Sequence, residues 1–418
     1  MSGVSVWKVL LGVEQHVVVE AVELEVSDDG EAVVVASVRQ ARRQSTRCGQ
    51  CRRRCPGYDR GEGRRRWRGL DLGTTRVFLE AEAPRVRCRE HGVVVAAVPW
   101  ARHDSPFTAA FEEQAAWLAA HATATTVAEL MRSSWRAVTR MVTRVVGEAR
   151  GKTDRLEGLR KIAIDEKAYR KGHRYITVVT DLDTGRVVWA AEGRSKATVE
   201  AFFADLGTER AAALTHVGCD GADWIHTVVT VKAPNAVLCL DSFHVVAWAG
   251  EAVEEVRRRI TRDLKAAGRG EDAKALKGSR WAVLKNPKNL TSGQQESLAV
   301  IKTTNGPLYR AYLIKEQLRE VFRAKGKRGR LLLAGVISWA SRSRIPEMVD
   351  LARKLRRFKD LITNTLDHGV TSALAENTNT HITVLARRAY GFHSPEALIA
   401  MIELTRGGLC PPLPGRVG

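Results

Sequence analysis

The chain has 418 residues, enough for roughly two to four domains with substantial cores. Its 67 Lys and Arg against 47 Asp and Glu give a formal net charge of +20, and the sequence pI is near 10.0, so the expected partner is a polyanion such as DNA or RNA. No apolar stretch approaches the roughly 20 residues of a membrane span, and the N-terminus lacks a secretory pattern. We therefore predict a cytoplasmic protein that does not bind a membrane.

The first quarter of the chain contains two short pairs of metal-binding residue types. The motifs CGQC and CREH place Cys48 with Cys51 and Cys88 with His91, and the two-residue gap lets both members of a pair reach one tetrahedral Zn²⁺. Turn signals flank the strand-like segment 76–82 between the pairs, as expected if a small β-ribbon carries them toward each other. The alternative is that these cysteines are unrelated thiols in an arginine-rich loop. Cys55, which belongs to neither pair, shows that not every cysteine in this segment need be a ligand.

An arginine-rich segment overlaps this zinc motif. Nine arginines lie between Arg47 and Arg68, opposed by Asp59 and Glu62, and the aromatic residues Tyr58 and Trp67 are interspersed among them. A solvated basic loop is the ordinary explanation of such a run, but the aromatic residues and the predicted zinc favour contact with the phosphate backbone of DNA. The predicted contacts are Arg52, Arg53, Arg64, Arg65 and Arg66.

A helical block is predicted for residues 105–150, with Ser105 before Pro106 as its start signal. Its segments TTVAELM and SSWRAVTRMVTRVV form two amphipathic helices joined by a tight turn, which is typical of a helix-turn-helix. The inward stripe of the second helix comprises Trp135, Val138, Val142 and Val145. Arg136, Arg140 and Arg144 recur on another face, as in a recognition helix that presents cations to a DNA groove. The alternative is a three-helix bundle with a solvated arginine face.

From about residue 159 the pattern changes to alternating strands and helices. Three consecutive strands are predicted from KIAID, YITVVTD and RVVWAA, followed by a helix with Ser195 as its N-cap. Two further strands, LTHVGCD and AVLCLD, each lead into a helix, and their residues Cys219 and Cys239 are expected to be buried. The order βββαβαβα is that of an RNase-H-like sheet.

Acidic residues close several of these strands. Asp165 closes the first and Asp220 the fourth, two positions that meet at one edge of an RNase-H-like sheet. Asp241 ends the fifth strand, and together with His244 it could also supply metal ligands, although a packed histidine at a helix start is the simpler reading. We prefer Asp220 to Asp241 as the metal ligand, because an acid on the fourth strand lies beside the central first strand in this topology. The two assignments are not exclusive. Such carboxylates suit divalent-metal phosphoryl chemistry, since hard cations need fixed oxygen ligands from separate elements.

A basic, largely helical stretch follows at residues 251–344 and is interpreted as an insertion into the catalytic fold. Pro346 then begins a further helix. The helical segment SALAENTNTHI carries Glu376, and Asn379 lies three residues on, so that both share a face. An isolated helical glutamate is usually just solvent-exposed, so the choice of Glu376 depends on a family resemblance.

Over nearly its whole length the chain resembles the zinc-ribbon DDE transposases of bacterial insertion sequences, in the ISL3 family. The likeness is carried in the correct order by CGQC and CREH, SSWRAV, IDE at Asp165, CDGADW at Asp220, PNAVLCLDSFHVV at Asp241, and ENTNTHITVLARRAYGFHS at Glu376. Two positions depart from the family pattern: His91 stands where many relatives have Cys, and Thr383 occupies a position that is often basic. Imidazole is a good zinc ligand, so the first departure is compatible with zinc.

The resemblance implies an RNase-H-like catalytic domain that is interrupted by a helical insertion. It also implies that a triad of acidic residues in this domain binds Mg²⁺ or Mn²⁺. The triad falls on Asp165, Asp220 and Glu376, and an Asp-x-x-His motif of the family falls on Asp241 and His244. The predicted domains are a zinc-ribbon DNA-binding domain at 1–104, a helix-turn-helix at 105–150, the first part of the catalytic domain at 158–250, the helical basic insertion at 251–344, and the catalytic C-terminal helices with the third acid at 345–406.

The predicted function is a DNA transposase that binds the inverted terminal repeats of an insertion sequence and catalyses metal-dependent end cleavage and strand transfer. Its partners would be double-stranded terminal repeats and target DNA, and synapsis of two ends predicts a homodimer or larger complex. One alternative is a transposase-derived, non-catalytic DNA-binding regulator, which would keep the N-terminal DNA-binding elements and lose the carboxylates. A metal-dependent nuclease without strand transfer would share the same triad.

Overall fold

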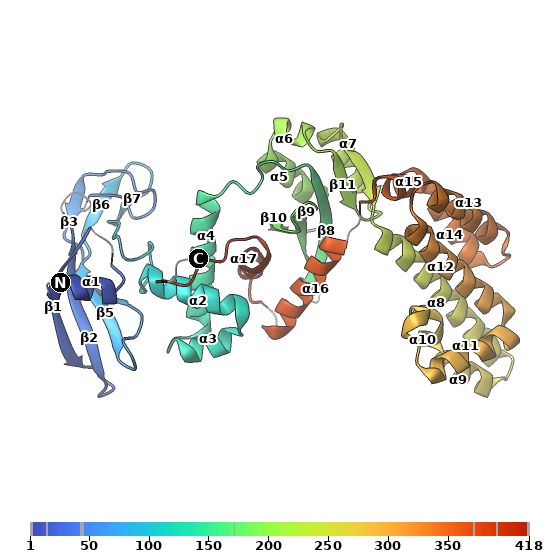
Figure 1. Ribbon diagram of the computed structural model, residues 1–418, viewed down its shortest axis with the longest axis horizontal. Coiled ribbons are helices and arrows are strands. Elements are labelled where there is room, and N and C mark those ends of the chain that lie inside the picture. The colour runs from blue at the N-terminus through green and yellow to red at the C-terminus, as the bar shows by residue number, and fades with distance from the viewer. Residues whose placement is uncertain are drawn as a thin grey trace. The chain divides into compact units, whose positions relative to one another are not determined.

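The computed structural model describes the backbone of residues 3–13, 16–41, 46–170, 172–370, 373–389 and 392–415, with side chains described in these ranges except at 3–5 and 373–376 (Figure 1). The chain divides into two units. The first contains residues 1–154 and 385–418, and the second contains residues 155–384. The predicted domain boundaries stay predictions.

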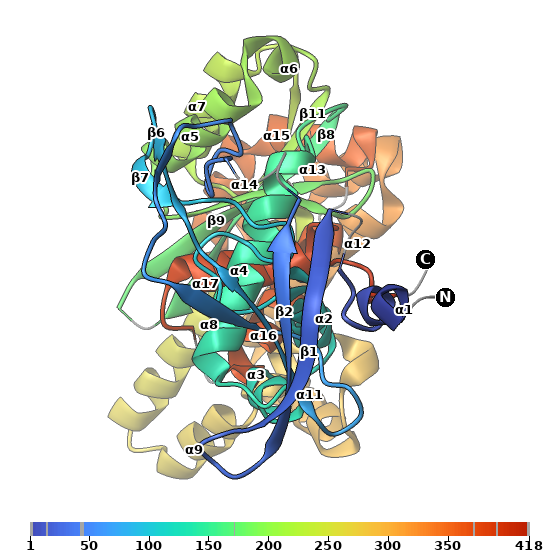
Figure 2. The same ribbon diagram turned by 90° about the vertical axis from the view of Figure 1, so that its left-hand side faces the viewer.

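A four-stranded sheet begins the first unit after helix α1 (Gly3–Leu10). Its strands are β1 (Val17–Val26), β2 (Ala32–Gln40), β5 (Arg76–Glu82) and β4 (Arg64–Arg68), in that spatial order. Strands β1 and β2 run antiparallel side by side (Figure 2). Alternating apolar residues bury one face, where Trp67 meets the edge of Trp100 at a centroid distance of 5.5 Å. Trp67 is therefore a core residue and does not stand among exposed arginines as the sequence suggested.

A second, three-stranded sheet consists of β3 (Gly57–Asp59), β6 (Arg85–Cys88) and β7 (Gly92–Val95). The segment 76–82 is a strand as predicted, but the expectation that it belongs to the ribbon carrying the cysteine pairs was wrong. Its inward residues Val77, Leu79 and Ala81 are buried where it pairs with β2 in the larger sheet. The β6–β7 hairpin instead holds the second metal-binding pair.

Helices α2 (Ala109–His121), α3 (Ala124–Leu130), α4 (Trp135–Lys152) and α17 (Pro395–Arg406) pack together in the same unit. The predicted helix start at Ser105 was wrong: its hydroxyl accepts from Phe107 N, and α2 begins after the cap Thr108, whose hydroxyl accepts from Phe111 N. Val138, Val142 and Val145 are buried as predicted. Trp135 was also predicted to face inward, but it is the first residue of α4, is 41% exposed and stacks on His393.

The second unit contains a five-stranded sheet. Its spatial order is β10 (Val187–Glu192), β9 (Arg174–Asp181), β8 (Lys161–Arg170), β11 (His216–Cys219) and β12 (Val237–Leu240). Strands β8 to β10 are antiparallel neighbours, whereas β11 and β12 run parallel to β8. All five strands were predicted, although β8 continues to Arg170, so Asp165 lies inside this strand and does not close it. Cys219 and Cys239 are buried, as predicted.

Helix α5 (Lys196–Leu206) packs on this sheet, followed by α6 (Thr208–Ala212) and α7 (Asp223–Lys232). Ser195 caps α5 as predicted, since its hydroxyl accepts from the backbone N–H of Thr198. The apolar residues that repeat at helical spacing are all buried against the strands. They are Val199, Phe202, Phe203 and Leu206.

The remainder of this unit is helical in the described ranges. It comprises α8 (Ser242–Ala266), α9 (Gly270–Gly278), α10 (Arg280–Leu284), the 3₁₀ helix η1 (Pro287–Asn289), α11 (Ser292–Thr304), α12 (Gly306–Ala324), α13 (Gly326–Arg342), α14 (Pro346–Arg357), α15 (Lys359–His368) and α16 (Ala373–Arg388), of which residues 385–388 belong to the first unit. Helices α8, α12, α13 and α14 share an apolar core (Figure 1). Among the helices that the structure describes, none is both long and apolar enough to cross a membrane.

The core of the second unit can be tested at Phe202, which is fully buried and meets Trp189 edge-on at a centroid distance of 5.7 Å. Truncating a buried phenylalanine to alanine costs about 3–5 kcal/mol, because the cavity only partly collapses. We expect F202A to lower the midpoint of urea unfolding of the full-length protein. Val231→Ala, at a position on α7 that is 70% exposed, should leave that midpoint unchanged, and an equal loss in both variants would contradict the assigned core.

Candidate functional site

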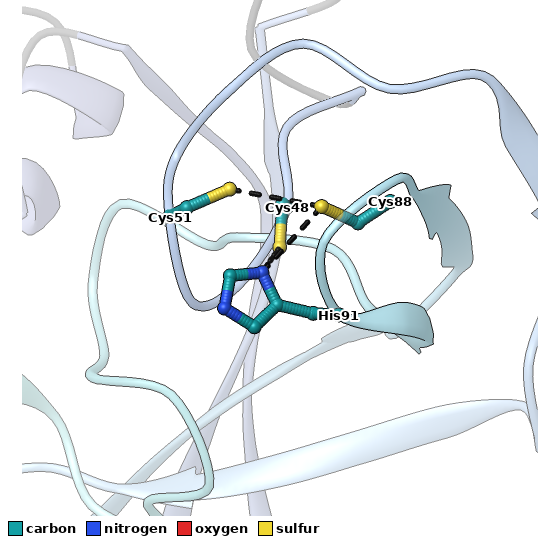
Figure 3. Close-up of side chains that lie close together, drawn as sticks. All are labelled: Cys48, Cys51, Cys88 and His91. Carbon is teal, nitrogen blue, oxygen red and sulfur yellow. Dashed lines mark hydrogen bonds between the residues drawn. The ribbon is translucent and has the colours of Figure 1, made fainter.

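Four side chains from the two predicted metal-binding pairs converge in the first unit, and their ligand atoms all lie within 4.8 Å of one another (Figure 3). The backbone of Cys48 forms an isolated antiparallel β-bridge with that of Ala96. Cys88 and His91 lie at the turn between β6 and β7. The His91 Nδ1 atom is 3.7 Å from Cys48 Sγ and 3.5 Å from Cys88 Sγ, and Cys51 Sγ is 3.7 Å from Cys88 Sγ. Three thiols and one imidazole are donors that zinc prefers in structural sites, so these residues fit Zn²⁺.

Local hydrogen bonds prepare this cluster for a cation. The backbone N–H of Glu90 and the imidazole of His91 lower the pKa of the Cys88 thiol to about 6, and the thiolate is the metal-binding form. Cys55 is not one of the four clustered residues, and its Sγ donates to the carbonyl oxygen of Arg53 at 3.4 Å. Burial raises the pKa of the Cys55 thiol, which keeps it neutral. Cys55 is therefore a natural control for its neighbours.

The arginines predicted to contact DNA near this cluster already have intramolecular partners. Arg64 and Arg66 pair with Glu80 at 3.0 and 3.1 Å, because β4 and β5 are neighbours. Arg53 pairs with Glu90, Arg52 donates to the carbonyl of Val98, and Arg65 donates to that of Ser105. Such exposed pairs are weak, so DNA phosphates can compete with them, and the DNA role of these residues stays a prediction.

The arginines of α4 differ in their surroundings. Arg136 and Arg140 are exposed, whereas the Nε atom of Arg144 donates to Glu112 Oε1 at 2.7 Å. Glu112 is completely buried and also accepts hydrogen bonds from Arg102 and Ser105. A buried carboxylate needs such partners, so Arg144 anchors α4 to α2 through Glu112. Its predicted contact with DNA stays a prediction.

In the second unit the register of the sheet brings three predicted acids to one edge. Gly218 of β11 is paired with Ala163 of β8, so Asp165 and Asp220 lie two residues further along parallel neighbours. Cys219 is paired with Leu240, so Asp220 and Asp241 likewise follow their strands at one level. The parallel pairing therefore assembles an acidic edge from three separate chain segments.

Asp165 and Asp241 are each held by neighbouring groups. Asp165 accepts from the backbone N–H of Glu166 at 2.7 Å and from the side-chain amide of Asn379 on α16. Burial raises the pKa of Asp165. Asp241 caps α8 and lies 2.9 Å from Nδ1 of His244, and this hydrogen bond raises the pKa of His244. The Glu376 side chain lies outside the described residues, although α16 spans its position.

Sequence reasoning missed Glu166 and its partner Arg194. The Glu166 side chain is buried, and its Oε2 lies 2.6 Å from Arg194 Nε. Burial, followed by repulsion from Asp220, raises the pKa of Glu166 to about 7. Asp220 itself accepts from the backbone N–H of Ala222 at 3.0 Å. The acid beside Asp165 in the motif IDE was the available signal, and strand alternation places its side chain on the opposite face of β8 from that of Asp165.

Comparison with known families agrees with this order of elements. A family model for DDE transposases of the ISL3 type, described as a transposase, matches residues 162–402. The chain belongs to the ISL3 family of transposases. The zinc-finger model of the transposases of IS204, IS1001, IS1096 and IS1165 matches residues 44–91, and the helix-turn-helix model of ISL3 transposases matches residues 96–146. The resemblance and the order of its DNA-binding and transposase parts are thus confirmed.

Two curated relatives extend over most of this ISL3 chain. The transposase for insertion sequence element IS1557 of Mycobacterium tuberculosis is 50% identical over 436 aligned residues, which cover 100% of this chain and 98% of the relative. The transposase for insertion sequence element IS1001 of Bordetella parapertussis is 28% identical over 366 residues, which cover 85% of this chain and 87% of the relative.

The zinc site of this ISL3 transposase can be tested with two neighbouring cysteines. Serine at Cys48 removes one of the four converging ligands, so we expect C48S to lose its zinc. C55S should keep it, because Cys55 is outside the cluster. The measurement is the zinc content of purified, dialysed protein by atomic emission. Full zinc occupancy in C48S would contradict the assigned ligand set.

Proposed function

We propose that this chain binds the inverted terminal repeats of its own insertion sequence and catalyses end cleavage and strand transfer with Mg²⁺ or Mn²⁺. The observation that carries the proposal is the hydrogen bond from Asn379 to Asp165, because it ties helix α16 to the acidic edge of the sheet. In an ISL3 transposase this is where a third acid from a distant helix is needed.

Helical geometry extends this contact to Glu376. Residues three apart lie on one face of an α-helix, so Asn379 at the edge brings position 376 to the neighbouring turn of α16. The sheet order β10-β9-β8-β11-β12, with Asp165 on the central strand and Asp220 after its parallel neighbour, supports an RNase-H-like assignment. The largely helical residues 251–344 would then be an insertion between the second and third acids.

The residues at this edge fit a hard cation. Asp165, Asp220 and Glu376 would hold Mg²⁺ or Mn²⁺, which when bound activates the attacking hydroxyl and stabilises the leaving oxygen at phosphorus. Asp165 is buried without a cationic side chain bonded to it among the described residues, so an added cation would lower the cost of keeping it ionised. Asp241 holds His244 and favours its protonated form, which suits an imidazole that faces phosphate oxygens.

The DNA-binding elements lie apart from these acids in the sequence. The zinc ribbon and helix-turn-helix would recognise the terminal repeats, with exposed Arg136 and Arg140 on α4 presented to the groove. Strand transfer needs two element ends in one complex, so a homodimer or larger assembly is proposed. Specificity and chemistry would thus occupy different parts of the chain.

Neutral isosteres test the proposed triad. Asp165→Asn and Glu376→Gln each keep the side-chain shape while weakening a metal ligand, so we expect both to lose cleavage and joining by about 100-fold or more. The assay incubates full-length protein with DNA carrying the element's own ends and Mg²⁺, and resolves cleaved and joined products on a gel. Asp183→Asn, on the β9–β10 turn where Asp183 pairs with Lys161 at 3.1 Å, is the matched control.

Each outcome of this assay separates the candidate functions. Undiminished activity in D165N or E376Q would refute the triad. Binding of the ends without cleavage by the wild type would favour the transposase-derived regulator. Cleavage without joining would favour a nuclease.

The recognition helix can be tested by the salt dependence of DNA binding. Removing one phosphate contact should lower the slope of log Kd against log salt by about one and weaken binding. We expect this for Arg140→Ala, measured by fluorescence anisotropy on terminal-repeat DNA. Lys152→Ala serves as the control on the same helix, because Lys152 pairs with Glu148 at 2.6 Å in the last turn. An unchanged slope in R140A would remove Arg140 from the proposed interface.

A further inference from the structure

A cavity of about 520 Å³ lies beside helix α4, and every residue that lines it belongs to the first unit. Helices α2, α3, α4 and α17 form its walls together with the end of α16. The lining includes the buried residues Val138 and Leu385 but also the exposed residues Arg136 and Arg140, so the cavity opens to solvent beside the arginines that are proposed to contact DNA. Its volume is within the range of about 300–1,000 Å³ that holds small organic ligands.

The charge of the lining favours an anionic ligand. Three arginines line the cavity, Arg136, Arg140 and Arg388, and the described part of the lining contains no acidic residue. Arg388 donates to the carbonyl oxygen of His121 at 3.1 Å, and this neutral partner does not cancel the charge of the guanidinium. A second copy of this chain carries a net charge of +20 and would be repelled here, whereas the phosphates of DNA would be attracted.

An aromatic surface adjoins these cations. Trp135, the first residue of α4, is 41% exposed and stacks on His393 with a centroid distance of 5.0 Å and an interplanar angle of 22°. The guanidinium of Arg136 lies 5.3 Å from the centroid of the Trp135 ring. Both aromatic residues line the cavity. Aromatic rings beside arginines bind nucleic-acid bases by stacking, whichever base is present, whereas carboxylates alone offer no flat surface to stack on them.

We propose that this cavity receives one DNA base that has left the helical stack, with Trp135 beside the base and Arg136 and Arg140 at the flanking phosphates. A base within a duplex exposes only its edges, so it must leave the stack to meet the face of an aromatic ring. Stacking on the ring and attraction of the phosphates then offset the cost of unstacking. This inference rests on the proposed function, because it assumes that α4 binds terminal-repeat DNA.

Mismatched DNA tests this cavity without any cleavage step. Full-length, zinc-loaded protein is titrated, without Mg²⁺, against terminal-repeat duplexes that carry one mismatched pair at each position in turn, and binding is measured by fluorescence anisotropy. A mismatched base unstacks at lower cost, so we expect one position at which the mismatch tightens wild-type binding by about fivefold or more. Trp135→Ala should lose this advantage, because it removes the stacking surface. Trp135→Phe should keep most of it, because a phenyl ring also stacks.

Trp281→Ala is the matched control. Trp281 is 51% exposed, and the guanidinium of Arg280 lies 5.0 Å from its ring centroid, but Trp281 does not line the cavity, so W281A should keep the full advantage. Should W135A not fold, Ala389→Leu decides. Ala389 is exposed and lines the cavity, so a larger side chain at this position must also reduce the advantage.

The outcomes distinguish this inference from the proposed function. If the wild type binds paired terminal-repeat DNA and gains nothing from a mismatch at any position, the inference is wrong while the proposed function stands. If W135A keeps the full advantage, or if W281A loses it as well, the inference is wrong. If A389L changes the molar mass in light scattering and leaves the advantage intact, the cavity is an interface between copies and the inference is wrong. If the wild type does not prefer terminal-repeat DNA to unrelated duplex DNA, the proposed function itself fails.

Discussion

The hydrogen bond between Asn379 and Asp165 joins segments that are 214 residues apart in the chain. Asp165 is held in place by β8, which pairs with β9 on one side and β11 on the other. Helix α16 contacts this strand where the side-chain amide of Asn379 donates to the buried carboxylate of Asp165. The remainder of the proposed centre depends on this contact, because no local interaction in the sequence brings position 376 near Asp165 or Asp220.

Parallel pairing is the second constraint on the site. The parallel register of β8, β11 and β12 places Asp165, Asp220 and Asp241 at one level without any contact between their side chains being required. Acids gathered in this way repel one another, and burial adds to the cost of their ionised forms. The structure offsets this cost differently at each acid: Asp241 is bonded to His244, Asp220 accepts from the backbone N–H of Ala222, and Asp165 accepts from the neutral amide of Asn379.

Buried carboxylates also organise the DNA-binding unit of this basic protein. Glu112 lies beneath α4 and binds both Arg102 and Arg144, and Glu403 of α17 binds Arg150. These arginines contribute to the net charge but are committed to internal ion pairs. The positive charge that DNA can reach is therefore smaller than composition suggests, and it is better represented by exposed residues such as Arg136 and Arg140.

Local patterns of residues were enough to predict most secondary-structure elements and the two pairs of zinc ligands. Two-residue spacing identified Cys48, Cys51, Cys88 and His91, and hydrophobic periodicity identified the five strands and α5, because both signals are local. The position and burial of several residues depended instead on contacts between distant parts of the chain. Tertiary structure placed segment 76–82 in the larger sheet, buried Trp67 and exposed Trp135. It also paired Arg144 with Glu112 and Glu166 with Arg194. These outcomes depend on which distant segments pair and pack, and periodicity within one segment carries no information about its partners.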